Sequence, residues 1–156
     1  MEGCVIRDAA ADDVDALRDV FRRASLSNEG DRPMLLAHPE HLVWNPEPSL
    51  TTRVASVDGR IAGFASTTPG DGFVELEDLF VDPDVRRRGV ARLLIDDAVR
   101  GATADGAPAI EVTGNEHAPA FYEAVGFIVV GTAPTAWASA PRLRRDLAGP
   151  HAPGRT

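Results

Sequence analysis

The dipeptide Asp58-Gly59 constrains the fold of this chain most, because it lies between two segments with the composition of β-strands. Residues 52–57 precede it and residues 60–66 follow it, and both segments carry β-branched or aromatic residues. An Asp-Gly pair in this position favours a two-residue hairpin turn. After a second turn at residues 69–72, a longer segment of strand character runs over residues 72–81. The sequence therefore predicts three consecutive antiparallel strands.

Helices and shorter strands are predicted on both sides of these three strands. Apolar residues at helical spacing indicate a helix over residues 14–24, with Asp12 or Asp13 as its cap. A second long helix begins near Arg88 and fades at the glycines of residues 101–106. Shorter helices are indicated at residues 33–37 and 119–125, and shorter strands at residues 5–6, 109–113, 127–130 and 141–147. This order predicts an α/β fold of the mixed α+β kind, with a mixed sheet flanked by helices.

The composition limits the classes of protein to which the chain can belong. Its 156 residues suit one domain, expected over residues 1–148, with residues 149–156 as a disordered tail. No apolar run approaches the roughly 20 residues that span a bilayer, and the acidic N-terminus does not resemble a signal peptide. We therefore expect a cytoplasmic protein without membrane contact. The single cysteine, Cys4, gives no intrachain disulfide and no CxxC motif, and we expect no metal.

The formal net charge of -8 bears on which kinds of molecule the protein can bind. All 16 cationic side chains are arginines, and 24 acidic side chains outnumber them. Nucleic-acid binding requires broad basic surfaces, so we expect no nucleic-acid partner. The acidic balance is compatible with a cationic small substrate.

Three consecutive arginines, Arg86 to Arg88, fall at the predicted junction between the long strand and the second long helix. The N–H groups at a helix start have no partner within the helix, and the helix dipole makes this end positive. Gly89 lets a ligand approach the backbone, small Ala91 keeps the turn open, and arginines offer paired donors for phosphate oxygens. The stretch therefore fits a pyrophosphate. The alternative is a solvated basic cap, although cations at this helix end are unfavourable by about 0.3–1 kcal/mol each, which favours a compensating anion.

Two motifs in the second half of the chain resemble the GCN5-related N-acetyltransferase (GNAT) family. The family's loop reads Arg/Gln-x-x-Gly-x-Gly/Ala, and its second signature is an Asn after a strand, then a Phe-Tyr pair and a Gly-Phe pair. These positions are matched here by Arg86, Gly89, Ala91, Asn115, Phe121, Tyr122, Gly126 and Phe127. The match spans residues 76–130. The resemblance implies the GNAT fold, in which a central, mostly antiparallel sheet of six to seven strands is flanked by about four helices.

The resemblance also implies acetyl-CoA as co-substrate, because the loop binds its pyrophosphate in this family. Main-chain groups of Leu79, Phe80 and Val81 would hydrogen-bond the pantetheine arm, and an amide at Phe80 or Val81 would hold the thioester carbonyl. The remaining contacts implied with the cofactor involve Arg86, Arg87, Arg88, Gly89, Val90, Ala91, Arg92, Asn115 and Tyr122.

Direct transfer needs a neutral amine, so a carboxylate that accepts the amine proton is expected. Glu77 is the preferred candidate, on the strand where many family members place an acidic residue. Strand alternation puts Glu77 and Asp78 on opposite faces, so Asp78 takes the role if the active face is the other one. Tyr122, at the family's tyrosine position, is the candidate acid that protonates the departing CoA thiolate. Strand carboxylates facing solvent and an aromatic packed beside Phe121 are the structural alternatives.

The function expected from these observations is acetyl-CoA-dependent N-acetylation of a primary amine on a small, possibly cationic molecule, in a ternary complex. Acetylation of a peptide or protein, at its N-terminus or a lysine, is the alternative within the same fold. A non-catalytic acyl-CoA-binding module is the alternative from another class. Residues 1 to about 50, where the family builds its acceptor site, match the family only in outline, and residues 25–48 carry no signature. Phe21, Trp44, His38 and His41 are expected to line the acceptor pocket or pack behind it. The predicted last strand could serve in a homodimer.

Overall fold

The computed structural model describes residues 3–85, 89–114, 119–135 and 139–147. The chain divides into two compact units, Met1–Ser66 with Asp78–Leu94 and Thr67–Glu77 with Ile95–Thr156. The expected single domain over residues 1–148 stays a prediction. The tail predicted at residues 149–156 lies outside the described residues.

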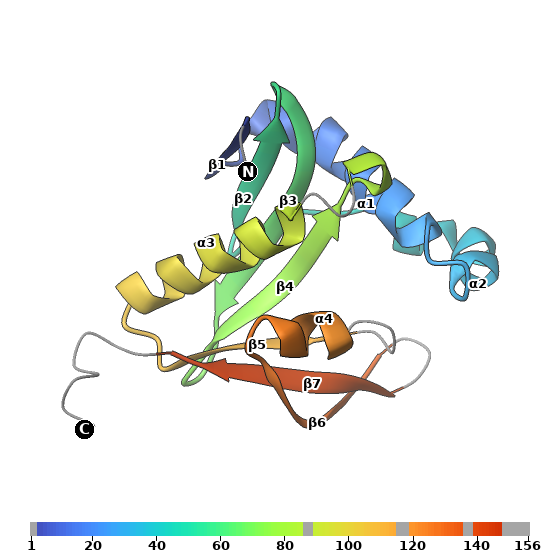
Figure 1. The fold of residues 1–156 in the computed structure, drawn as a ribbon. Coiled ribbons are helices and arrows are strands. Elements are labelled where there is room, and N and C mark those ends of the chain that lie inside the picture. The colour runs from blue at the N-terminus through green and yellow to red at the C-terminus, as the bar shows by residue number, and fades with distance from the viewer. Residues whose placement is uncertain (1–2, 86–88, 115–118, 136–138, 148–156) are drawn as a thin grey trace, which may run out of the picture. The chain divides into compact units, whose positions relative to one another are not determined.

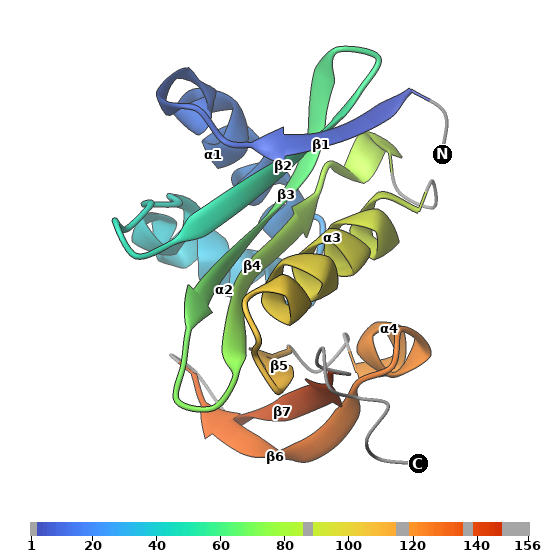
Figure 2. The ribbon, with the colours of Figure 1, turned by 90° about the vertical axis from the view of Figure 1, so that its left-hand side faces the viewer.

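The first unit contains the N-terminal helices and the predicted hairpin. Its elements are β1 (Cys4–Asp8), η1 (Ala11–Asp13), α1 (Val14–Leu26), α2 (Arg32–Ala37), η2 (Pro39–Leu42), β2 (Thr51–Val57), most of β3 (Arg60–Pro69), the end of β4 (Val74–Val81), η3 (Pro83–Val85) and the start of α3 (Val90–Ala104). In Figure 2, α1 and α2 lie behind the strands of this unit. Asp58 and Gly59 have φ angles of 53° and 80°. This left-handed backbone confirms the predicted turn, because an Asp-Gly pair adopts it at low cost.

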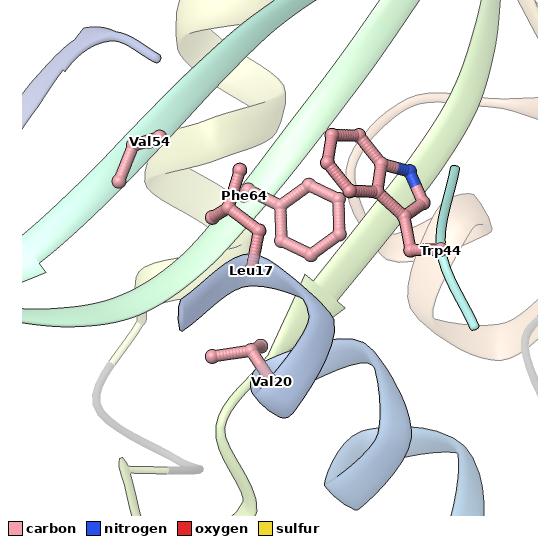
Figure 3. Close-up of a cluster of buried hydrophobic side chains, with 5 residues drawn as sticks. All are labelled: Leu17, Val20, Trp44, Val54 and Phe64. Carbon is pink, nitrogen blue, oxygen red and sulfur yellow. The ribbon is translucent and has the colours of Figure 1, made fainter. Parts of the chain in front are cut away.

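The core of the first unit forms where α1 packs on β2 and β3. Leu17 and Val20, one turn apart on α1, point toward Val54 and Phe64, and the Trp44 ring lies beside Phe64 (Figure 3). Leu17 and Val20 belong to the apolar face that the sequence predicts for this helix. The cluster fixes α1 against the two strands that precede β4.

The start of α1 differs from the expectation that an aspartate side chain caps it. Asp13 precedes the helix but makes no capping hydrogen bond into it. Its Oδ2 instead accepts the Ala10 N–H at 2.7 Å, and its carboxylate pairs with Arg7. The expected side-chain cap is therefore wrong, because the turn η1 leads directly into α1 and the Asp13 carboxylate folds back onto the start of that turn.

The second unit contains the C-terminal strands. Its elements are the end of β3, the start of β4, most of α3, β5 (Ala109–Thr113), α4 (Pro119–Ala124), β6 (Ile128–Pro134) and β7 (Ser139–Asp146). The antiparallel strands β6 and β7 run side by side (Figure 1). Gly126, with φ at 98°, follows α4, as expected for a C-terminal glycine.

The strand order is β1-β2-β3-β4-β5-β7-β6. The β4–β5 pair is parallel, whereas the pairs β1–β2, β5–β7 and β6–β7 are antiparallel. Seven strands with four α-helices among the described residues confirm the predicted mixed sheet flanked by helices.

Candidate functional site

The acidic residues of β4 have different surroundings. Asp78 is half-buried, and its Oδ2 accepts a hydrogen bond of 2.9 Å from the indole Nε1 of Trp44. Glu77 is exposed, and its Oε2 accepts a hydrogen bond of 2.6 Å from Thr68 Oγ1. Strand alternation requires this difference, because neighbouring side chains point to opposite faces. Asp78 therefore lies with the buried aromatic side chains of the first unit, and Glu77 lies at the surface.

Trp44 joins the segment after η2 to both α1 and β4. Its ring meets Phe64 edge-on with 5.0 Å between centroids, and only 5% of its surface is exposed (Figure 3). Arg18 on α1 donates through Nε to the Trp44 carbonyl at 2.9 Å and through a terminal nitrogen to Asn45 Oδ1 at 3.1 Å. The indole N–H is thus held in position toward Asp78. Phe21 packs against the same cluster.

The end of β4 continues beyond the residues that pair with β5. The β4–β5 register covers Val74 to Leu76, opposite Ile110 to Val112. Phe80 packs its ring against Phe21 and Phe64, with centroid distances of 4.7 and 5.7 Å. On the neighbouring strand, a Cβ on Gly63 would lie 2.7 Å from the Phe80 carbonyl oxygen. Glycine at this position therefore permits close approach of β3 to the predicted cofactor-binding main chain.

The start of α3 is the predicted pyrophosphate site, and its residues from Gly89 onward are described by the structure. Gly89 has φ at 77°, and among the described residues no atom beyond its chain neighbours and its own helix lies within 4 Å of where its Cβ would stand. The Leu93 N–H donates to the Gly89 carbonyl at 3.0 Å, which is the first bond of the helix. The preceding amides, at Val90, Ala91 and Arg92, therefore have no partner within the helix. A left-handed glycine, open space beside it and first-turn amides fit a phosphate group.

Tyr122 belongs to the second unit. Its ring is buried between Phe121 and Phe127, with edge-to-face centroid distances of 5.2 and 5.4 Å. Burial raises the pKa of the Tyr122 phenol to about 12. The phenol therefore keeps its proton throughout the neutral range, as a proton donor must. Tyr122 also anchors the turn after α4, because its carbonyl accepts the Phe127 N–H at 3.0 Å.

The described residues account for only part of the predicted site. Asp78, the strand end Leu79 to Val81 and the helix start Gly89 to Arg92 belong to the first unit, whereas Glu77 and Tyr122 belong to the second. The predicted positions Arg86, Arg87, Arg88 and Asn115 lie outside the described residues. All of these assignments stay predictions. The Trp44–Asp78 bond was not predicted, since no local pattern links residues 34 positions apart.

The part of the chain that the structure describes holds no group of three or more His, Cys, Asp or Glu side chains placed to bind a metal ion. None of its helices is long and apolar enough to cross a membrane.

Comparison with known proteins defines the class of protein. The model of the acetyltransferase (GNAT) family matches residues 14–127, which include β4, the α3 start and α4. The chain therefore belongs to the GNAT family of acetyl-CoA-using acetyltransferases. None of the curated proteins that were compared matches it.

Solved structures with this fold come from several bacteria. A GCN5-related N-acetyltransferase from Rhodopseudomonas palustris superposes with a TM-score of 0.75 at 19% identity, covering 94% of this chain and 98% of that one. The ribosomal-protein-S18-alanine N-acetyltransferase of Escherichia coli gives 0.71 at 20% identity, over 95% and 97% of the two chains. A phosphinothricin acetyltransferase from Sinorhizobium meliloti, solved with acetyl-CoA, gives 0.68 at 18% identity, over 95% and 91%. At these identities the likeness establishes the fold alone.

Proposed function

We propose that this protein transfers the acetyl group of acetyl-CoA directly to a primary amine of a small molecule. Asp78 accepts the amine proton. The observation that carries the proposal is the half-buried Asp78 carboxylate, held by the Trp44 indole N–H on the strand that leads into the predicted cofactor loop. A carboxylate fixed in this way is oriented before substrate arrives, which supports a role in proton transfer.

Asp78 is proposed as the base in preference to Glu77. The two carboxylates flank the same peptide bond, but only Asp78 accepts a bond from the segment that follows η2. That segment falls within residues 1 to about 50, where the resemblance to the family places the acceptor site. Glu77 is exposed, and it accepts a hydrogen bond from Thr68 on β3. The sequence favours Glu77, whereas the contacts favour Asp78, so the two assignments make opposite predictions for their variants.

The left-handed Gly89 and the first-turn amides of α3 support binding of the cofactor diphosphate at the helix start. When bound, acetyl-CoA supplies the thioester carbonyl that the amine attacks. Main-chain N–H groups at Phe80 or Val81 are proposed to donate to that carbonyl oxygen. Such a donor also stabilises negative charge that develops on the oxygen, which is worth about 2.7–4 kcal/mol in other acyl-transfer sites.

The proton and bond changes balance within this scheme. The amine nitrogen forms a bond to the acetyl carbon, and the bond from that carbon to sulfur breaks. Asp78 takes the proton that the amine loses. Tyr122 is proposed to protonate the departing sulfur, and because burial makes its phenol a weaker acid, the proposal needs the phenol to be positioned against the sulfur. The net charge of -8 supports a cationic acceptor.

The test measures free-CoA release from acetyl-CoA with a panel of small amines and of peptides carrying free N-termini or lysines. We expect turnover with small amines. Asp78→Asn should lower kcat/KM about 100-fold, as loss of a general base does. Glu77→Gln should leave kcat/KM within about threefold of the wild-type value, because the proposal gives Glu77 no proton to accept. Tyr122→Phe should lower kcat by at least about tenfold.

Glu47→Gln is the matched control, since Glu47 is an exposed carboxylate in the same segment as Trp44. Trp44→Phe keeps a ring in the core but removes the N–H donor, and it should lower kcat without abolishing it. Turnover with peptides alone would make the small-molecule acceptor wrong. CoA binding without thiol release from any acceptor would favour the non-catalytic module. A larger loss in Glu77→Gln than in Asp78→Asn would reassign the base.

A further inference from the structure

Asp82 occupies the point where the chain leaves β4. Only 1% of its surface is exposed, although it is a carboxylate. Its N–H donates to the Ala62 carbonyl at 2.7 Å, and its Oδ1 accepts the Asp84 N–H at 2.9 Å. The first bond ties the residue to β3, and the second shapes the turn η3. The direction of the chain between β4 and η3 is therefore fixed by both the main chain and the side chain of Asp82.

Arg23 on α1 supplies the principal counter-charge. Its two terminal nitrogens donate to the two carboxylate oxygens of Asp82 at 2.6 and 2.7 Å. Its Nε donates at 2.9 Å to Asp19, one turn earlier on the helix, so the guanidinium plane is held from its own helix as well. Arg60 adds a longer bond of 3.2 Å to the same carboxylate. The Arg23 guanidinium holds the pKa of Asp82 below its usual range, so the pair is charged at neutral pH.

The same helix contacts β4 at a second point. The Phe21 ring meets the Phe80 ring edge-on at 4.7 Å, two residues before Arg23 and two residues before Asp82. Phe80 and Asp82 have the spacing of residues on one face of a strand. The helix α1 thus contacts the end of β4 through the Phe21–Phe80 ring contact and through the ion pair of Arg23 with Asp82, which has two hydrogen bonds.

This arrangement bears on cofactor binding under the proposed function, on which the inference rests. The main chain at Leu79 to Val81 and the amides at the α3 start are the two described parts of the proposed cofactor site. The chain between them begins at Asp82 and η3. A shift at Asp82 would change the spacing of the two parts, and small misplacement of binding groups weakens binding.

We propose that Arg23 is a positioning residue for acetyl-CoA: by holding Asp82 through two hydrogen bonds, it fixes the exit of β4 and thereby strengthens cofactor binding without touching the cofactor. The geometry of the arginine fork is what the role requires. A lysine would keep the charge but lose the paired donors.

The experiment compares Arg23→Met, Arg23→Lys and Asp82→Asn with a matched control, Arg22→Met. Arg22 is the neighbouring arginine on α1 and is exposed, so its loss leaves the Asp82 contacts in place. The dissociation constant for CoA is measured by calorimetry well below the melting temperature of every variant, and the melting temperatures are measured separately. Steady-state kinetics then give KM for acetyl-CoA and kcat.

We expect Arg23→Met to weaken CoA binding about tenfold, the size that coupling through a packed contact can reach. Arg23→Lys should weaken binding less than Arg23→Met, and Arg22→Met should bind CoA as the wild type does. KM for acetyl-CoA should rise in Arg23→Met, with kcat little changed. The lysine variant keeps the test decisive if the methionine variant does not fold.

The outcomes separate this inference from the function on which it rests. Lower melting temperatures with unchanged CoA affinity in Arg23→Met and Arg23→Lys would overturn the positioning role and leave the proposed function intact. An equal loss of affinity in Arg22→Met would overturn it too, because that residue has no part in the network. Wild-type protein that binds no CoA would overturn both.

Discussion

Each compact unit contains a network of arginines and carboxylates, but the two networks hold different parts of the chain. In the first unit, Arg23 and Arg60 converge on one buried carboxylate, Asp82, which also accepts a main-chain N–H. In the second unit, carboxylates on the neighbouring strands β4 and β5 meet arginines on β7: Arg142 pairs with Glu75 and Glu111, and Arg144 pairs with Glu111. One network therefore surrounds a turn, and the other extends over a sheet.

The comparison shows that two networks of the same residue types can contribute differently to the stability of the fold. The strands beneath the second network are already joined by main-chain pairing, with Glu111 opposite both Glu75 on β4 and Arg144 on β7. Its carboxylates keep some solvent access, with 17% and 14% of the Glu75 and Glu111 side chains exposed. At Asp82 the β4 strand has ended, so the side chain directs the turn that follows. We expect the Asp82 network to contribute more to stability than the Arg142 network.

The largest effect should come from removing the negative charge at the centre of the first network. Asp82→Asn removes the buried carboxylate that accepts hydrogen bonds from both terminal nitrogens of Arg23, and leaves the exposed carboxylates of Asp19 and Asp84 as its anionic neighbours. Removing one partner of a buried pair costs about 3–5 kcal/mol, and we expect a loss of about 3 kcal/mol because Arg23 keeps partial solvent access. Urea unfolding followed by circular dichroism measures the change in free energy of unfolding.

Asp84→Asn is the matched control for this substitution. The Asp84 carboxylate is exposed and stands 3.8 Å from both Arg23 and Arg60. Its neutralisation should change the free energy of unfolding by less than about 0.5 kcal/mol, as expected for an exposed pair. Equal losses in the two variants would remove the distinction between a buried centre and its surface neighbours.

Acid pH should reduce the stability that Asp82 contributes. Its folded pKa is lowered, chiefly by the hydrogen bonds from Arg23, relative to an ordinary aspartate with a pKa of about 3.9. A carboxylate of this kind contributes its full stabilisation above the unfolded pKa and loses it as pH falls through the folded pKa. The difference in free energy of unfolding between wild type and Asp82→Asn should thus be constant near neutral pH and shrink below about pH 4. A difference that grows on acidification would contradict the assignment.

A smaller effect is expected in the second network. Arg142→Met removes the cation between Glu75 and Glu111 and its contact over the Phe73 ring, whose centre lies 5.4 Å from the guanidinium carbon. We expect a loss of about 1 kcal/mol, the upper end for solvent-accessible pairs, because the strands stay paired. The same unfolding assay measures it, and a double variant with Glu111→Gln gives the coupling between the two side chains. A loss as large as that of Asp82→Asn would show that the sheet depends on this row of charges.

Local features of the fold could be predicted from the sequence, whereas the partners within these networks could not. The Asp58-Gly59 turn, the apolar face of α1 and the glycine after α4 each follow from neighbouring residues and their backbone preferences. Arg23 and Asp82 are 59 residues apart, and Arg142 and Glu75 are 67 apart. Their contacts arise only once strands and helices are assembled, so no periodicity encodes them.

The same limit applies to the candidate base. Alternation along β4 predicts that Glu77 and Asp78 face opposite sides, but it does not predict which side carries α1 and Trp44. That choice depends on how residues 14–44 pack on the strands, and this segment has no recognisable motif. Gly89 could be predicted, unlike the base, because its left-handed backbone favours glycine and depends on neighbouring residues alone.

The smallest expected effect separates the two networks by their response to salt. At ~1 M NaCl the Debye length falls to about 3 Å, so charges with solvent access are screened while buried pairs are screened much less. The stability difference between wild type and Arg142→Met should therefore shrink by a few tenths of a kcal/mol in high salt. The difference between wild type and Asp82→Asn should stay nearly constant, since the Asp82 carboxylate is almost fully buried and bonded on both oxygens. Sodium chloride titrations of the urea midpoint for all three proteins test this. Parallel shifts in both variants would mean that solvent reaches the two networks equally, and the contrast between a buried turn and a charged sheet surface would then be lost.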